Sequence, residues 1–215
     1  MNLKTIKIIK INMKKIIILF LVLIFIIGCK VEEPVTISEE TKEKVMGMKA
    51  LLIIAQNNFR DEELAEPKAI LESAGIEVQV ASITTGVAKG MLGMEVTPDL
   101  AVKDADTADY DAIVVIGGAG SPELANHKEV LELLVDAESK GKIIGSICMG
   151  PTVLAKAGIL KGKKCTVFSA GADAVKAGGA DYTGEDVVVD GKLVTATGPE
   201  VAKAFGKKLV EVMGG

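Results

Sequence analysis

The sequence has no tryptophan, a single histidine and only 3% aromatic residues, so its core cannot be built mainly on large rings. With 215 residues, of which 49% are hydrophobic, the chain is long enough to bury one substantial core, which we expect to be rich in Val, Ile and Ala. Histidine, cysteine and carboxylate residues nowhere cluster at metal-ligand spacing. The sequence therefore predicts no metal site.

The common nucleotide-binding motifs are also missing. Gly118-Ala119-Gly120 lacks the third glycine of the dinucleotide fingerprint, and no Gly-Lys-Ser/Thr follows it, so we expect no such cofactor. The first 28 residues contain five lysines and no acid, which leaves 20 basic and 29 acidic residues in the rest of the chain. Because an acidic surface repels phosphate backbones, nucleic-acid binding is disfavoured.

The N-terminus has the order of charges and apolar residues that is typical of a secretory signal. A lysine-dotted start precedes the apolar run Ile16–Ile27, which is shorter than the roughly 20 residues of a transmembrane helix. Ile26-Ile27-Gly28-Cys29 resembles a lipoprotein lipobox, in which the cysteine after the cleavage site receives lipid. We therefore interpret residues 1–28 as a lipoprotein-type signal peptide and Cys29 as the lipidation site, with an uncleaved anchor as the alternative.

Residues 29–47 are interpreted as a polar tether, because they are rich in acids, contain Pro34 and show no apolar periodicity. This predicts a domain that is lipid-anchored to the cell membrane and faces away from the cytoplasm. Met13 is an equally good signal start. A start at Met46 or Met48 would instead give a cytoplasmic protein.

Residues 48–215 alternate between strand and helix patterns, which predicts one doubly wound α/β sandwich with a mostly parallel central sheet. The segment from Gly86 to Val102 contains glycines and Pro98, and we expect a loop or small hairpin there. Expected strands are Ala50–Ala55, Glu77–Ile83, Ala112–Ile116, Ile143–Ile144, Lys164–Phe168 and an Asp-Gly hairpin over Val187–Thr195; expected helices are Arg60–Ala74, Lys128–Lys140, a segment after Pro151, and Pro199–Met213.

The segment around Cys148 has the form of a nucleophile elbow. Ser146 and Gly150 are small residues two positions to either side of Cys148, and Pro151 suits the first turn of the helix that follows. A thiol at a helix N-terminus meets the positive end of the dipole and free N–H groups, which predicts a lowered pKa. The alternative is a buried cysteine that acts as a small hydrophobic residue.

Two further features are expected at the carboxyl ends of the strands, where open α/β sheets bind ligands. Gly117 and Gly118 would let backbone N–H groups approach an oxyanion, although a plain tight turn is the alternative. Pro67 cannot bond the carbonyl of Glu63, so the helix should start or kink there and Glu63 can point inward beside the thiol. A surface position at the helix N-terminus is the alternative, and it suits Asp61 and Glu62.

Together these motifs resemble the PfpI superfamily over residues 49–213, a group that contains PfpI-type intracellular proteases and the Parkinson-disease-associated deglycase. The motifs are Phe59-Arg60-Asp61-Glu62-Glu63-Leu64-Ala65-Glu66-Pro67 with Ala74-Gly75-Ile76, Gly117-Gly118, Ile147-Cys148-Met149-Gly150-Pro151, and Asp190-Gly191 with Thr195 and Gly198-Pro199. The resemblance implies a flavodoxin-like sandwich of the class I glutamine amidotransferase type that forms a homodimer or larger homo-oligomer. It further implies that Cys148 is the nucleophile, that Glu63 hydrogen-bonds it, and that Gly118 and Met149 supply backbone oxyanion donors.

The sequence departs from the family where a histidine is expected. Met149 follows the cysteine, where protease-type members have histidine, and Phe168 matches the position from which deglycase-type members supply one. His127, the only histidine, precedes a helix and is expected to be exposed and idle. Without a Cys–His pair, peptidase activity is disfavoured.

The favoured function is a cysteine-dependent enzyme of the glyoxalase or deglycase kind that acts on small carbonyl compounds or glycated side chains, with Glu63 moving the proton. The alternatives are a PfpI-type cysteine peptidase and a non-enzymatic binding or redox-sensing domain. Because two neighbouring negative charges are unfavourable in a partly dry site, we expect Glu63 to be protonated whenever Cys148 is ionised. Whether Cys148 and Cys165 can form a disulfide stays open.

Overall fold

The computed structural model describes residues 37–215; residues 1–36, with the predicted signal segment and Cys29, lie outside the described residues. The α-helices are α2 (Glu39–Val45), α3 (Asp61–Ser73), α4 (Lys128–Ser139), α5 (Pro151–Lys156), α6 (Ala172–Ala177) and α7 (Ala202–Met213). The strands are β1 (Lys49–Ile53), β2 (Asn57–Phe59), β3 (Glu77–Ser82), β4 (Ala88–Gly90), β5 (Glu95–Val96), β6 (Leu100–Ala101), β7 (Ala112–Val115), β8 (Ile143–Ile147), β9 (Lys164–Cys165), β10 (Asp181–Tyr182), β11 (Val187–Asp190) and β12 (Leu193–Ala196).

Seven strands form the central sheet in the order β11-β12-β8-β7-β1-β3-β6. All neighbours pair in parallel except β11 and β12, which form the hairpin predicted from Asp190-Gly191. Gly191 occupies the left-handed region there, with φ 59°, which a tight hairpin turn requires. The parallel strands place their carboxyl ends at one edge of the sheet, and this edge carries the candidate site.

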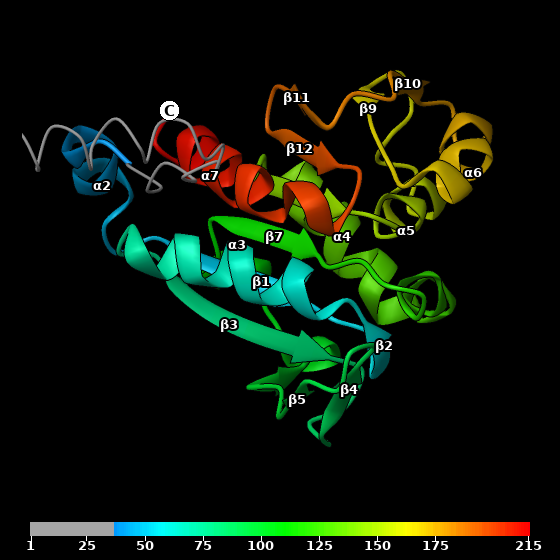
Figure 1. Ribbon diagram of the computed structural model, residues 1–215, viewed down its shortest axis with the longest axis horizontal. Helices are drawn as coiled ribbons and strands as arrows, with labels where there is room; N and C mark the ends of the chain where they lie inside the picture. Colours follow the sequence, from blue (N-terminus) through cyan, green and yellow to red (C-terminus); the bar gives the residue numbers. More distant parts are fainter. Residues whose placement is uncertain (1–36) are drawn as a thin grey trace, which may run out of the picture. The chain divides into compact units, whose positions relative to one another are not determined.

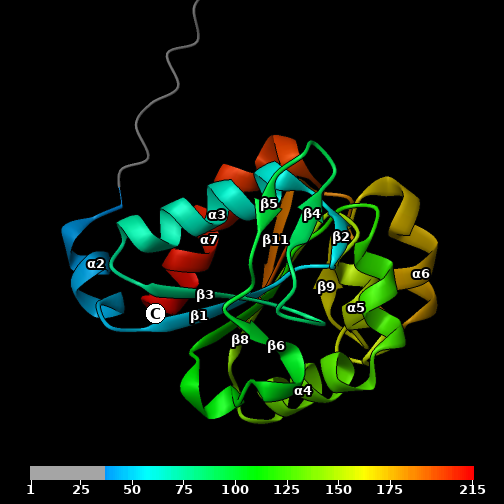
Figure 2. The same ribbon diagram turned by 90° about the horizontal axis from the view of Figure 1, so that it is seen from below.

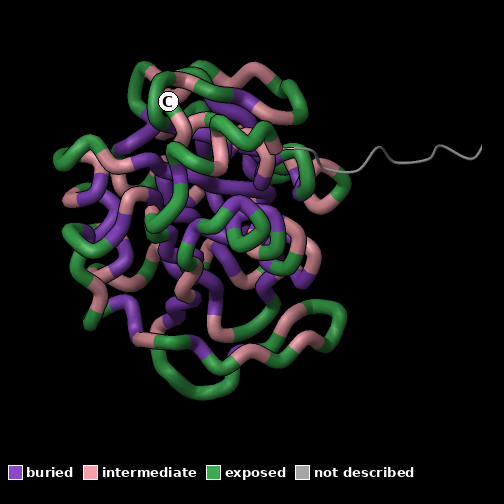
Figure 3. The backbone as a smooth tube through the Cα atoms, turned by 90° about the vertical axis from the view of Figure 1, so that its left-hand side faces the viewer, coloured by how far each residue is buried: buried purple, intermediate pink, exposed green. Residues whose placement is uncertain are grey.

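Helices cover both faces of the sheet, with α3 and α7 on one face and α4 and α5 on the other (Figures 1 and 2). Neighbouring residues of β1 show why the strand is continuously apolar: Leu52 packs in the core beneath α3 and α7, and Leu51 and Ile53 pack in the opposite core. Figure 3 shows the buried backbone in the interior and the exposed turns around it. The fold is the predicted flavodoxin-like α/β sandwich.

One smaller feature corrects the sequence-based expectation, a second refines it and a third agrees with it. The strand expected over Lys164–Phe168 is only β9, which pairs with β10 in a separate two-stranded sheet. Helix α3 begins at Asp61, so Glu63 lies in its first turn, and the helix continues through Pro67. The segment from Gly86 to Val102 is confirmed as irregular, with β4 and β5 forming a hairpin and β6 joining the edge of the central sheet.

The end of the predicted tether is also structured. Residues 39–45 form α2. Ser38 caps its N-terminus, because the hydroxyl of Ser38 accepts a hydrogen bond from the backbone N–H of Thr41 at 3.1 Å. Val45 is fully buried in the core that contains α7, so this part of the chain belongs to the domain. Val45 is the one apolar residue within α2, so the helix shows no apolar periodicity and the sequence pattern did not indicate it.

Among the described residues, no helix combines the length and apolarity that crossing a bilayer requires.

Candidate active site

The predicted elbow is present, and its backbone is strained at the cysteine. Cys148 directly follows β8 and has φ 58°, a left-handed conformation that is rare for a residue with a side chain and costs about 1–3 kcal/mol. Its N–H donates to the carbonyl of Ala196 at 2.9 Å, and its own carbonyl accepts from the N–H of Phe168 at 3.0 Å. These two bonds fix the turn between β12 and the loop after β9. Such strain typically accompanies a functional residue.

Small residues flank the elbow for a steric reason. A Cβ on Gly150 would lie 2.4 Å from Ser146 Oγ and 2.7 Å from the carbonyl oxygen of Val115. A Cβ on Gly117 would lie 2.2 Å from Glu63 Oε2 and 2.4 Å from Cys148 Cβ. Gly117 therefore leaves room for the carboxyl and the thiol-bearing carbon to approach the same point, and this brings Glu63 and Cys148 together.

Glu63 occupies the first turn of α3, and its side chain is completely buried. Both carboxyl oxygens lack a hydrogen-bond partner among the described residues. Burial raises the pKa of Glu63 to about 7 from its ordinary value of 4.5, while the nearby Cys148 thiol and Arg60 oppose this shift. The thiol is close enough to influence the carboxyl but lies outside regular hydrogen-bond geometry. Near neutral pH, this carboxyl can therefore both accept and release a proton.

The predicted lowering of the thiol pKa is wrong. Burial raises the pKa of Cys148 to about 12, with the charge of Glu63 as the next largest cause. The backbone N–H groups of Gly118 and Met149 favour the thiolate, as expected, but their effect is smaller. Helix α5 has only six residues, and a dipole summed over so few peptides does not offset the burial of an 8% exposed side chain. The resting site therefore holds a neutral thiol.

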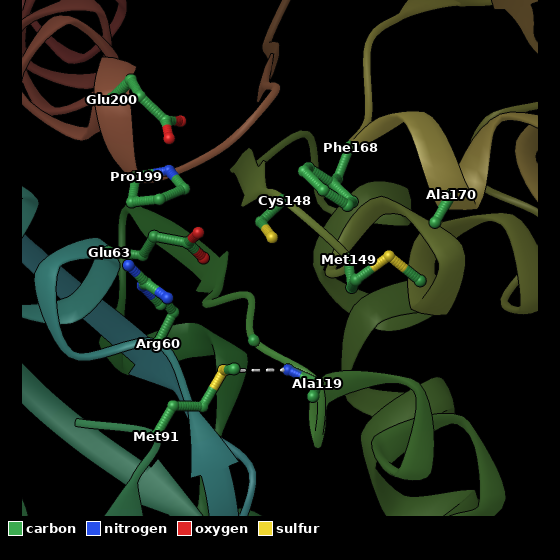
Figure 4. Close-up of a pocket in the computed structure, with 11 residues that line it drawn as sticks. Arg60, Glu63, Met91, Ala119, Cys148, Met149, Phe168, Ala170, Pro199 and Glu200 are labelled. Atoms are coloured by element: carbon green, nitrogen blue, oxygen red, sulfur yellow. Dashed lines mark hydrogen bonds between the residues drawn. The ribbon is translucent and has the colours of Figure 1, made fainter. Parts of the chain in front are cut away.

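Cys148 and Glu63 open into a pocket of about 520 Å³. Figure 4 shows the charged side chains Arg60, Glu63 and Glu200 on one side of the thiol and the apolar side chains Met149, Phe168 and Ala170 on the other. The pocket is lined by Arg60, Glu63, Met91, Gly118, Ala119, Cys148, Met149, Phe168, Ala170, Pro199 and Glu200. A pocket of this size and mixed lining suits a small organic substrate or the end of a side chain.

The β4–β5 hairpin supplies one wall of the pocket through Met91. Asp61 holds the hairpin turn, because its buried carboxylate accepts from the backbone N–H groups of Leu92 at 2.9 Å and Met94 at 2.7 Å. Met91 Sδ in turn accepts from the N–H of Ala119 at 3.4 Å (Figure 4). The interpretation of Asp61 as a surface acid is therefore wrong: it is 6% exposed and anchors a pocket wall.

The other candidate residues lie apart from this pocket. His127 borders a separate cavity of about 370 Å³, together with Gln56 and Asn58. Cys165 and Cys148 are both free thiols, and burial raises the pKa of Cys165 to about 11. The described residues contain no group of histidine, cysteine and carboxylate side chains that could hold a metal ion.

The structure thus brings together Cys148, Glu63, Gly117, Gly118 and Met149, all of which were selected from the sequence. It also places Phe168 in the pocket, where the family resemblance predicted a histidine position. Sequence reasoning missed the lining residues Met91 and Glu200. Glu200 follows Gly198-Pro199 at the carboxyl end of β12, so the rule that ligands bind at strand ends would have found it if the pairing of β12 with β8 had been known.

Comparison with known proteins agrees with this architecture. The chain belongs to the DJ-1/PfpI family, whose model matches residues 48–212. It is 43% identical over 182 residues to an uncharacterised protein of Methanocaldococcus jannaschii, a match that covers 83% of this chain and 89% of the relative. It is also similar to a ThiJ/PfpI domain protein of Brachyspira murdochii in its solved structure, with a TM-score of 0.75, 36% identity, and coverage of 77% of this chain and 95% of that one.

Several relatives have names that state an activity. The deglycase PfpI of Pyrococcus furiosus is 31% identical over 163 residues, which cover 76% of this chain and 98% of the relative. The glutathione-independent glyoxalase DJR-1.2 of Caenorhabditis elegans is 32% identical over 166 residues, which cover 77% of this chain and 89% of the relative.

Proposed function

We propose that this protein is a cysteine-dependent enzyme that acts on α-oxoaldehydes or on glycated side chains, as its deglycase and glyoxalase relatives are named for doing. One observation carries the proposal: a strained, neutral Cys148 and a buried Glu63 with no other partner meet at the base of one pocket. Their pairing supplies a nucleophile and a proton carrier without a histidine.

The first chemical step is addition of the thiol to the carbonyl group of the substrate. Ionised Glu63 accepts the thiol proton while sulfur forms a bond to the carbonyl carbon and the C=O π electrons move to oxygen. Protonated Glu63 then returns the proton to that oxygen, which gives a neutral hemithioacetal. The N–H groups of Gly118 and Met149 favour negative charge at the sulfur in the resting site. In the proposed reaction they are the donors to the negative charge that develops on the carbonyl oxygen of the substrate.

Peptide hydrolysis is the weaker candidate, because a peptide amine must be protonated before it leaves, and the described residues of the pocket include no histidine, which is the usual proton donor of thiol proteases. Addition to an aldehyde needs no leaving group. The remaining alternative is a redox-sensing domain, in which Cys148 is oxidised stoichiometrically without turnover.

The test is formation of 2-hydroxy acid from methylglyoxal by the parent chain, Cys148→Ala and Cys165→Ala. We expect turnover in the parent and in Cys165→Ala, whose residue is buried and does not line the pocket, and none in Cys148→Ala. Absence of turnover in the parent, or equal turnover in Cys148→Ala, would remove the proposal. Cleavage of a peptide library that depends on Cys148 would favour the peptidase instead.

For the location of the protein, we propose that lipid on Cys29 tethers the domain to the outer side of the cell membrane. A start at Met46 or Met48 would delete α2 and the fully buried Val45, and this supports an upstream start. The test is membrane fractionation of Cys29→Ala. If this variant stays as firmly bound as the parent, the lipobox interpretation is wrong.

A further inference from the structure

The charges around the pocket do not balance. Among the described residues, Arg60 is the only basic side chain in the lining. Its guanidinium already forms two hydrogen bonds with Glu62, at 2.8 Å from Nε and 3.1 Å from Nη2. Because this bidentate pair already engages the guanidinium, Arg60 offers little positive charge to a substrate carboxylate. The two remaining charged groups in the lining, Glu63 and Glu200, are both acidic.

Glu200 lies where it can meet an incoming substrate. It belongs to the short 3-10 turn Pro199–Val201 between β12 and α7, is exposed, and forms no ion pair with any of the residues from 37 onward. Its carboxylate folds back toward the pocket, on the same side of the thiol as Glu63 (Figure 4). The charge of Glu200 contributes to the raised pKa of Glu63, which is consistent with this proximity.

The aromatic ring of Phe168 borders the same space beside Gly198 as the carboxylate of Glu200. The position that a Cβ on Gly198 would occupy is 3.3 Å from Glu200 Oε2 and 3.9 Å from Phe168 Cδ2. Phe168 is 44% exposed, so part of its ring is open to the pocket. A cation between a carboxylate and an aromatic ring is attracted by the charge of the first and the quadrupole of the second.

We propose that Glu200 and Phe168 form a cation subsite at the mouth of the pocket, which selects carbonyl substrates bearing an ammonium or guanidinium group over those bearing a carboxylate. The identification of the bound molecule as a substrate rests on the proposed function. The subsite itself does not, because it is formed by residues of the pocket. It predicts that 2-oxo acids are excluded, since Glu63 and Glu200 repel their carboxylate and Arg60 is occupied.

The subsite can be tested without turnover, through the rate at which charged reagents modify Cys148. Three methanethiosulfonates carry an ammonium, a sulfonate or no charge; in each reaction the thiolate sulfur forms a disulfide bond and methanesulfinate leaves. Rates are measured on the full chain by peptide mass spectrometry, which counts Cys165 separately. Each charged rate is divided by the rate of the neutral reagent on the same variant, so a change in the reactivity of the thiol itself cancels.

We expect Glu200→Gln to lower the ratio of the cationic to the anionic rate by about fivefold, since one charge about 8 Å away acts with opposite sign on the two reagents even at the dielectric constant of water. Phe168→Leu should lower the cationic rate alone. The matched control is Glu43→Gln, an exposed glutamate on α2 that does not line the pocket and should leave the ratio unchanged. The difference between parent and Glu200→Gln should shrink in 0.5 M salt.

A ratio that is the same in the parent and in Glu200→Gln would overturn the subsite. If the ratio falls as expected but no carbonyl compound is turned over, the subsite stands and the proposed enzymatic function fails. If methylglyoxal is turned over but the ratio does not change, the function stands and the cation subsite is wrong.

Discussion

Replacing Glu63 by glutamine tests the central pair of the site, because it removes a charge and keeps nearly the same shape. The pKa of Cys148 is raised to about 12 first by burial and then by the charge of Glu63. Glutamine leaves the burial in place and removes the charge. We therefore expect the Cys148 thiol to ionise more readily in Glu63→Gln than in the parent.

The size of the effect follows from Coulomb's law. A unit charge about 4 Å from the sulfur contributes about 4 kcal/mol at an effective dielectric constant of about 20. Water in the open pocket weakens this, so we expect Cys148 to react at least about tenfold faster at a fixed alkaline pH, which corresponds to about 1.4 kcal/mol. The gain should exist only where the parent Glu63 is ionised. Since its pKa is about 7, the two proteins should react alike at pH 5.5 and diverge as the pH rises through 7.

The assay is the rate of alkylation of Cys148 by iodoacetamide between pH 5.5 and 9.5, read by peptide mass spectrometry. Glu66→Gln is the matched control, since Glu66 lies on the same helix but does not line the pocket. Glu63→Leu, which loses the hydrogen-bond donor as well, should react more slowly than Glu63→Gln. If Glu63→Gln reacts no faster than the parent at pH 9, or if the ratio of their rates does not change across pH 7, the carboxylate does not act on the sulfur.

Three further outcomes follow. Folding raises the pKa of Glu63 from 4.5 to about 7, so the folded state binds the proton more tightly and stability is lost as the pH rises between these values. The parent should lose about 3 kcal/mol of unfolding free energy over this range, and urea unfolding of Glu63→Leu should not show this loss. Gly117→Ala places a Cβ 2.2 Å from Glu63 Oε2, so it should lower the free energy of unfolding by about 1–3 kcal/mol and remove most of the reactivity of the Cys148 thiol. The control Gly86→Ala, whose Cβ meets only an ordinary contact at 3.4 Å, should change neither the stability nor the thiol reactivity. Asp61→Asn should destabilise the β4–β5 turn by about 1–2 kcal/mol, seen as faster hydrogen exchange at Leu92; unchanged exchange would contradict its anchoring role.

The sequence was informative wherever one local rule decided the structure. The apolar strands β1 and β7 are buried on both faces, and Asp190-Gly191 forms the hairpin that its composition predicts. The elbow was recognisable because a strained cysteine needs small neighbours, and Gly150 shows this requirement directly. The fold and the position of the strained turn at Cys148 could therefore be read from short patterns.

Features that depend on distant packing could not be predicted. The pKa of Cys148 is raised rather than lowered because the thiol is deeply buried, and no motif encodes the depth of burial. The anchoring of the β4–β5 turn by Asp61 joins residues 31 and 33 positions apart. Glu200 enters the pocket only because β12 pairs in parallel with β8. In each case the sequence supplies the side chain, and the topology decides which group it meets.

The chemistry of the site follows from the missing histidine. An ordinary imidazole has a pKa of about 6.5, which suits it to move protons near neutral pH, whereas an ordinary glutamate has a pKa of about 4.5 and is a poor base there. Burial gives Glu63 a pKa of about 7, close to that of the imidazole that family resemblance leads one to expect. The same burial raises the pKa of Cys148 and favours the neutral thiol, so in the proposed reaction the thiol is activated only when Glu63 takes its proton. In the proposed reaction, desolvation of one carboxyl therefore takes the role of a histidine and limits activation of the thiol to the moment of substrate addition.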